Sequence, residues 1–251
     1  MEEHAWLLWS LGFLVVWVGL YLMTPARRQM VRTSLWTMPL GLTEPLFVPE
    51  YWNPPTLFDL AQRTGFDVES LIFTFAIGGI GTVLYEAIVP VRHTVMNHAE
   101  RHHRRHRYHW LALISPVLVF GLLMAGTSWN PIYAGSLAMF VGAIASLLCR
   151  PDLKTKIWVG GGVFLLLYFA FFQLLDLAFP GYVERVWTLS ALSGVLIWGV
   201  PLEEYLFAVT FGMMWSSVYE HVSWQKIVPV FGKGQHQRQP WSTDDVRGEV
   251  R

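Results

Sequence analysis

The stretch Val200-Pro201-Leu202-Glu203-Glu204-Tyr205-Leu206-Phe207 places two adjacent carboxylates at the start of an apolar run that continues to Tyr219-Glu220. Apolar residues also lead into it, from Leu189 to Trp198. Charge within a bilayer is costly, so acids flanked by this much apolar sequence indicate a functional site. Proline and glutamate are also ordinary in the first turn of a helix, where they suit the unpaired N–H groups and the helix dipole. The stretch therefore predicts the start of a helix, and a catalytic and a structural role both stay open for its two acids.

The composition is that of an integral membrane protein. Of the 251 residues, 53% are hydrophobic and 14% are charged, and several apolar runs reach the length of about 20 residues that crosses a bilayer. The first run, 6–23, follows Glu2 and Glu3 and lacks a clear cleavage site, so we expect a retained helix and not a signal peptide. Cys149 is the single cysteine, which excludes an internal disulfide and makes a cysteine-built metal cluster unexpected.

Apolar runs and charge placement together predict an all-α protein with seven transmembrane helices. We expect them at 5–23, 33–48, 67–91, 109–127, 131–149, 157–178 and 200–222, the second being interrupted by Pro39 and Pro45. The intervening segments 24–32, 92–108, 150–156 and the tail from 223 carry 3, 5, 3 and 5 Lys or Arg, or 16 of the 18. The positive-inside rule then places the N-terminus outside and the C-terminus in the cytoplasm of a multi-pass protein, which we expect in a bacterial inner membrane.

The chain also resembles itself at an offset of 134 residues. The matching pairs are Glu69 and Glu203, Phe73 and Phe207, Gly78 and Gly212, Tyr85 and Tyr219, and Glu86 and Glu220. An offset of 132 aligns Glu44 with Asp176. These matches predict two parallel three-helix repeats joined by a connecting helix. The expected parts are a first repeat at 1–91, a basic His-rich loop with the connecting helix at 92–130, a second repeat at 131–222, and a disordered cytoplasmic tail at 223–251.

The acidic residues divide into two layers. Glu69 and Glu86 are 17 residues apart, or about 25 Å along a helix. The candidate catalytic residues, near the outer ends of their helices, are Glu44, Glu69, Asp176, Glu203 and Glu204. For Glu86 and Glu220, at the inner ends, we expect contacts with basic loops. In a close pair of carboxyls one can hold a proton while the other stays ionised, which suits giving a proton to one atom and taking it from another.

Aromatic residues accompany the outer acids, and their π faces can stabilise a cation. The candidate substrate-binding residues are Trp52, Phe73, Trp187, Tyr205, Phe207 and Phe211. Packing within the membrane and anchoring at its interface explain any one of these rings equally well. Together, acids and rings in an apolar pocket suit acid-catalysed chemistry on a hydrocarbon.

Here the sequence resembles a known family. Pro201-Leu202-Glu203-Glu204 is similar to the Pro-x-Glu-Glu signature of the membrane lycopene cyclases of the heterodimeric or fused, fungal-and-archaeal type. Tyr219-Glu220 resembles the helix end that follows in this family, and so do three motifs of the first half: Tyr51-Trp52-Asn53-Pro54, Asp67-Val68-Glu69-Ser70-Leu71-Ile72-Phe73 and Tyr85-Glu86. The resemblance covers the chain to about Val222.

The resemblance implies a lycopene beta-cyclase, an isomerase of carotenoid biosynthesis that works by acid–base catalysis. A glutamic acid would protonate the terminal alkene of an acyclic carotene, the carbocation would close a six-membered ring, and a base would remove a ring proton. The family's acids carry over onto Glu203, Glu204 and Glu69, whereas Asp67 stands in place of Pro and Ser70 in place of the second Glu of the first module. The implied partners are a carotenoid or other isoprenoid substrate, the lipid bilayer, and a second copy of the chain or other carotenoid enzymes, with no nucleic acid.

Neither a cofactor nor a resident metal is expected. Gly78-Gly79-Ile80-Gly81 lies within a predicted membrane helix and not after a strand, so it is no phosphate loop, and Gly160-Gly161-Gly162 indicates close helix packing. The loop before the fourth helix contains His98, His102 and His103 at a spacing found in histidine boxes. It has no second box and its interleaved arginines repel cations, so a solvated basic loop is favoured over a regulatory metal or a lipid contact.

Two other functions stay open at this point. A proton-coupled transporter would use the intramembrane acids as ion sites, and parallel repeats occur in transporters too. A retinal-type photoreceptor needs a lysine within a membrane helix for the Schiff base. The predicted seventh helix contains no lysine, so this third interpretation is weak.

Overall fold

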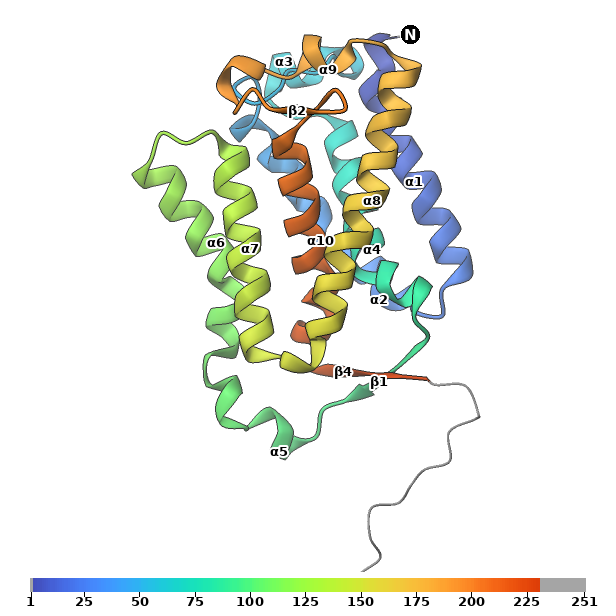
Figure 1. The fold of residues 1–251 in the computed structure, drawn as a ribbon, viewed down its shortest axis with the longest axis vertical. Coiled ribbons are helices and arrows are strands. Elements are labelled where there is room, and N and C mark those ends of the chain that lie inside the picture. The colour runs from blue at the N-terminus through green and yellow to red at the C-terminus, as the bar shows by residue number, and fades with distance from the viewer. Residues whose placement is uncertain (1, 231–251) are drawn as a thin grey trace, which may run out of the picture.

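The structure is a computed structural model that describes residues 2–230 as a helical bundle (Figure 1). The α-helices are α1 (Ala5–Met23), α2 (Arg27–Thr37), α3 (Leu60–Thr64), α4 (Val68–Ile88), α5 (His98–Arg101), α6 (His109–Gly126), α7 (Pro131–Cys149), α8 (Lys154–Ala178), α9 (Tyr182–Val186) and α10 (Leu202–Ser223). Short 3-10 helices lie at Glu2–His4, Leu57–Asp59, Arg104–Tyr108, Pro151–Leu153 and Leu189–Ala191, and a longer one, η2, spans Met38–Leu46. The strands are β1 (Val91–Val95), β2 (Leu196–Ile197), β3 (Val200–Pro201) and β4 (Gln225–Pro229).

Helical structure occupies each of the seven segments predicted to cross the membrane. Five of these helices, at 5–23, 68–88, 104–126, 131–149 and 151–178, are long and apolar enough to span a bilayer. This is compatible with a membrane protein. Among the described residues, α2 is short, and α10 contains three glutamates at 203, 204 and 220. Seven spans, and the orientation of the termini, therefore stay predictions.

The bundle consists of two sets of three helices with the same packing pattern. In the first set α4 packs against both α1 and α2, and in the second α10 packs against both α7 and α8. The central helices α4 and α10 also pack against each other, while α6 connects the sets and lies outside α7 (Figure 1). This arrangement agrees with two similar modules and a connector. The repeat itself stays a prediction.

Glycine allows α8 and α10 to approach closely. A Cβ atom on Gly212 would lie 2.6 Å from the Phe164 Cβ and 2.8 Å from the Gly160 carbonyl oxygen. On the α8 side, a Cβ atom on Gly160 would lie 2.5 Å from the Ser216 Cβ, and one on Gly161 would lie 2.5 Å from the Met213 Cγ. The predicted close packing is thus present at Gly160 and Gly161, where it sets the distance between the two helices beside the cavity described below, and is absent at Gly162, where a Cβ atom would have nothing within 4 Å.

The second helix differs from the prediction of 33–48. Helix α2 begins at Arg27, within a segment expected to be a basic loop, and gives way at Met38 to the 3-10 helix η2. Pro39 in the first turn of η2 and Pro45 within it lack the N–H group that a continuing α-helix needs. The early start places Gln29, which is 3% exposed, inside the bundle.

Two antiparallel strands close one end of the bundle, and neither was predicted. β1 pairs with β4 in a register that sets Val91 opposite Pro229 and Val95 opposite Gln225. The strands lie at the opposite end from α3 and α9 (Figure 1). Residues 225–229 belong to the segment expected to be a disordered tail, and the rest of that tail, 231–251, lies outside the described residues.

Candidate active site

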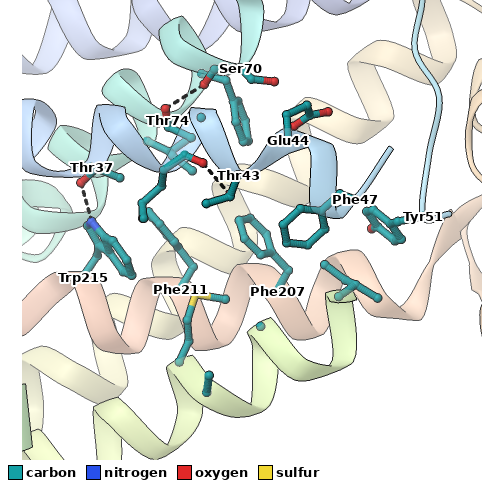
Figure 2. A pocket seen from close by; sticks show the side chains of 18 of the residues that line it. Thr37, Thr43, Glu44, Phe47, Tyr51, Ser70, Thr74, Phe207, Phe211 and Trp215 are labelled. Carbon is teal, nitrogen blue, oxygen red and sulfur yellow. Dashed lines mark hydrogen bonds between the residues drawn. The ribbon is translucent and has the colours of Figure 1, made fainter. Parts of the chain in front are cut away.

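An apolar cavity of about 450 Å³ lies between the two sets of helices. Its walls come from η2 and α4 on one side, from α10 on another, and from α6 and α7 on a third. Figure 2 shows Phe207 and Phe211 on α10 pointing into it, with Glu44 and Tyr51 toward one end and Trp215 toward the other. Only two acidic residues of the described chain line it, Glu44 and Glu204.

Glu204 receives three hydrogen bonds from side chains. Tyr168 Oη and Trp187 Nε1 donate to its carboxyl oxygens at 2.9 and 2.7 Å, and Tyr51 Oη donates to the same oxygen as Trp187. The residue lies in the first turn of α10 and is 4% exposed. Three donors on one carboxyl stabilise its ionised form, as does the N-terminus of the helix that carries it, and they offset part of the cost of burying the charge. This carboxylate is therefore suited to accept a proton.

Glu44 has a different environment. It lies near the end of η2 and is 8% exposed, and its Oε1 atom has no hydrogen-bond partner in the described part of the chain. A buried carboxylate oxygen without a donor is costly when charged, so such surroundings favour the protonated form. Ser70 borders the same end of the cavity (Figure 2). In the predicted repeat Ser70 is the counterpart of Glu204, and Glu44 supplies a carboxyl group to the cavity near this serine.

The other three predicted acids lie outside the cavity lining. Glu203 is 1% exposed and accepts hydrogen bonds from Tyr133 Oη and from the Ser193 backbone N–H at 2.8 Å, which ties α10 to the preceding loop. Glu69, also 1% exposed, accepts from the Leu57 N–H at 2.8 Å. Asp176 is partly exposed near the end of α8. The structure thus brings Glu44 and Glu204 together at one cavity and sets Glu69, Asp176 and Glu203 apart from it.

Five of the six predicted aromatic residues line the cavity, namely Trp52, Phe73, Trp187, Phe207 and Phe211. Tyr205 lies outside the lining, and its hydroxyl donates to the Ile197 carbonyl oxygen at 2.8 Å. Trp52 and Trp187 come from the loops that precede α4 and α10, and they form an isolated antiparallel bridge with ring centroids 5.3 Å apart. This bridge holds the two loops together above Glu204.

Sequence reasoning missed the tyrosines that bind Glu204. Tyr51 stands in the Tyr-Trp-Asn-Pro motif beside the predicted Trp52, so the motif pointed to it. Tyr168 is one aromatic residue among many in the apolar helix α8, and nothing in its local sequence marks it. Its hydroxyl reaches Glu204 because the close α8–α10 contact brings these two helix faces together.

A second polar cluster lies at the end of the bundle that carries β1 and β4. Lys156 Nζ, fully buried, is 2.6 Å from Oε1 of both Glu86 and Glu220. Gln29 Nε2 donates to the same two carboxylates at 2.9 and 3.1 Å. Gln29 and Lys156 are each the third residue of their helix, α2 and α8, so each of the two sets of helices contributes one side chain to the same pair of acids.

The imidazole of His93, on β1, completes this cluster. Its Nε2 atom is 3.3 Å from Glu86 and 3.1 Å from Glu220. Burial lowers the pKa of His93, but the hydrogen bonds and charges of Glu220 and Glu86 outweigh burial and raise the pKa to about 9. The expected contact of these glutamates with basic residues is present, yet it is a buried network and not a contact with solvated loops.

No curated protein and no solved structure matches the chain. A scan against family models matches residues 130–222 to the family described as lycopene cyclase. The matched segment contains α7, α8 and α10, and hence Glu204, Tyr168 and Trp187 with the loop that leads to them. This match supports a lycopene cyclase domain at residues 130–222 of the chain.

Proposed function

We propose that the protein is a membrane carotenoid cyclase that closes a six-membered ring at the open end of an acyclic carotene such as lycopene. The observation that carries the proposal is the pair of carboxyl groups, Glu44 and Glu204, on the wall of one apolar, aromatic cavity. The family match supports a carotenoid substrate, and the cavity supports a hydrocarbon end group. A transporter is not favoured, because the matched family is one of cyclases.

The two carboxyl groups take opposite roles in this proposal. Glu44, which lacks a donor at Oε1, carries the proton and gives it to the terminal double bond of the substrate. Protonation leaves a carbocation at the more substituted carbon, and the next suitably placed double bond attacks it and closes the ring. The positive charge then lies within the ring, and the ionised Glu204 accepts the proton whose loss forms the ring double bond. Substrate and product are isomers, so no oxidant, reductant or second substrate is consumed.

Phe207, Phe211 and Trp52 protect and stabilise the intermediate. Their rings line the cavity, and an aromatic face attracts a cation at close range. The apolar walls also keep water from the carbocation, which water would otherwise capture as an alcohol. The cavity of about 450 Å³ accepts an end group and leaves the long polyene to extend between the helices toward the lipid.

Expression in cells that accumulate lycopene tests the proposal. The expected result is the appearance of cyclic carotenes, identified by chromatography and absorption spectrum, at the expense of lycopene. A chain that accumulates in the membrane and leaves the carotenoid profile unchanged would contradict the proposed activity. Seven membrane spans, with the β1–β4 end in the cytoplasm, are proposed along with it and can be tested by accessibility of single introduced cysteines in a Cys149→Ser background.

A further inference from the structure

Two histidines, one in the basic loop and one at the start of α6, approach the single cysteine of the chain. Cys149 Sγ, at the end of α7, lies 3.4 Å from His106 Nδ1 and 3.6 Å from His109 Nδ1. All three atoms lie within 4.8 Å of one another. The group is at the β1–β4 end of the bundle, and it contains neither of the two acids that line the apolar cavity.

The distances fit a tetrahedral metal centre. Zinc binds cysteine sulfur at about 2.3 Å and histidine nitrogen at about 2.0–2.1 Å, so tetrahedral angles set sulfur and nitrogen about 3.6 Å apart. The two observed sulfur–nitrogen distances are 3.4 and 3.6 Å. Both sulfur–nitrogen distances thus already match those of a tetrahedral zinc site.

Burial and access are also suitable. His109 is 2% exposed and Cys149 is 4% exposed. A separate cavity of about 370 Å³ has His106 and Cys149 in its wall and leads to the surface of the loop. An ion can enter by this cavity, and a water molecule within it can complete the coordination.

The nearest cation does not exclude a metal. Arg150 follows Cys149 in the chain, but its guanidinium group pairs with Asp152 at 2.9 and 2.7 Å and donates to the carbonyl oxygen of Glu220. Its charge is therefore balanced locally. A second cluster of possible ligands among residues 2–230, Glu86, His93 and Glu220, differs because the ammonium group of Lys156 already lies between its two carboxylates.

We propose that His106, His109 and Cys149 bind one Zn²⁺ ion, with a water molecule from the adjoining cavity as the fourth ligand. The sulfur binds as thiolate, so the thiol proton is released to solvent as the zinc–sulfur bond forms. Nitrogen and thiolate donors select zinc or another soft transition metal over Mg²⁺ or Ca²⁺. The ion links the loop before α6 to the end of α7.

Metal content of the purified full-length protein, carrying a tag without histidine, tests the site. After dialysis against Zn²⁺ and removal of free metal, the expected content is one zinc per chain. Cys149→Ser, which is nearly isosteric, and His106→Asn, at a partly exposed position, should each weaken zinc binding at least tenfold. The matched control is His98→Asn with His102→Asn, since these two rings stack on each other in the same loop away from the three ligands and should leave zinc content unchanged.

Cobalt gives a second readout. Replacing zinc by Co²⁺ should produce the absorption band of thiolate-to-cobalt charge transfer together with the intense visible bands of a tetrahedral site, and Cys149→Ser should abolish the first. Unchanged thermal unfolding of the metal-free variants shows that a loss of binding is not a loss of fold. Zinc content well below one per chain in the wild type would overturn the proposal, and so would full zinc binding in Cys149→Ser or loss of zinc only in the His98/His102 control.

Discussion

Replacement of Glu204 by glutamine should remove the proton acceptor and leave the shape of the cavity intact. The side chain is 4% exposed and is held by Tyr51, Tyr168 and Trp187, and glutamine fills the same volume. It can still accept from these donors through one oxygen. Its amide cannot take a ring proton from the carbocation, so the final step of the reaction should fail.

The contacts of Glu204 show how strongly its site favours a charged group, and the typical contribution of a general base gives the expected loss of rate. A hydrogen bond to a charged group contributes about 1.5–3 kcal/mol, against about 0.5–1.5 kcal/mol for a neutral pair. With a difference of about 1 kcal/mol for each of three donors, these contacts favour a charged over a neutral group by about 3 kcal/mol. A positioned general base contributes about 10²- to 10⁴-fold, so we expect a loss between these two limits.

The assay is the initial rate of cyclic carotene formation in membranes supplied with lycopene, normalised to the amount of protein in the membrane. Glu203→Gln is the matched control, because the two residues are adjacent and equally buried but Glu203 lies outside the cavity lining. Its loss of charge weakens the hydrogen bonds from Tyr133 and Ser193, and we expect a loss of about tenfold or less. The reasoning is refuted if Glu204→Gln keeps more than a third of the wild-type rate, or if Glu203→Gln is impaired as severely.

Three further predictions concern the proton donor, the buried ion network and the helix contact. Glu44→Gln should reduce cyclisation by about 100-fold or more with unchanged protein level, and a rate within threefold of wild type would remove Glu44 from the mechanism. The pKa of His93 is raised from 6.5 to about 9, so its protonated form stabilises the fold by at most about 3 kcal/mol. This stabilisation is complete below pH 6.5 and is lost as the pH rises through 9. Thermal unfolding between pH 6 and 10 should therefore show a decline in the wild type and not in His93→Gln. Gly212→Ala should lower the amount of folded protein in the membrane, since its Cβ atom would lie 2.6 Å from the Phe164 Cβ. Gly162→Ala should not, because no heavy atom lies within 4 Å of its Cβ position. Equal levels of the two variants would contradict the packing argument.

The positions of the helices could be predicted from the sequence, because they depend on local signals. The same holds for the end of the bundle at which Glu44 and Glu204 lie. Runs of apolar residues marked α1, α4, α6, α7 and α8 within a few residues, and the Pro-Leu-Glu-Glu stretch marked the start of α10. The matches at an offset of 134 drew attention to α4 and α10, which are the central helices of the two sets. Aromatic residues near the acids were then expected in the pocket, and most of them line it.

What the sequence did not reveal depends on contacts between distant segments. Nothing near Glu44 or Glu203 in the chain says that the first faces the cavity and the second a loop, because this is decided by the rotation of each helix in the bundle. The pairing of β1 with β4 joins residues more than 120 positions apart. The proximity of Cys149 to His106 and His109 arises in the same way, from the folding of the basic loop back onto the end of α7.

The central claim is that a carboxyl group of the cavity gives its proton to a double bond of the substrate. The most direct measurement is cyclisation of unlabelled lycopene by membranes equilibrated in D2O, followed by mass spectrometry of the cyclic product. Since carboxyl protons exchange with solvent between turnovers, the product should carry one deuterium for each ring formed, located in the ring and absent from unreacted lycopene. Cyclic carotene formed in D2O without deuterium would contradict protonation by Glu44 or by any other exchangeable acid of the protein.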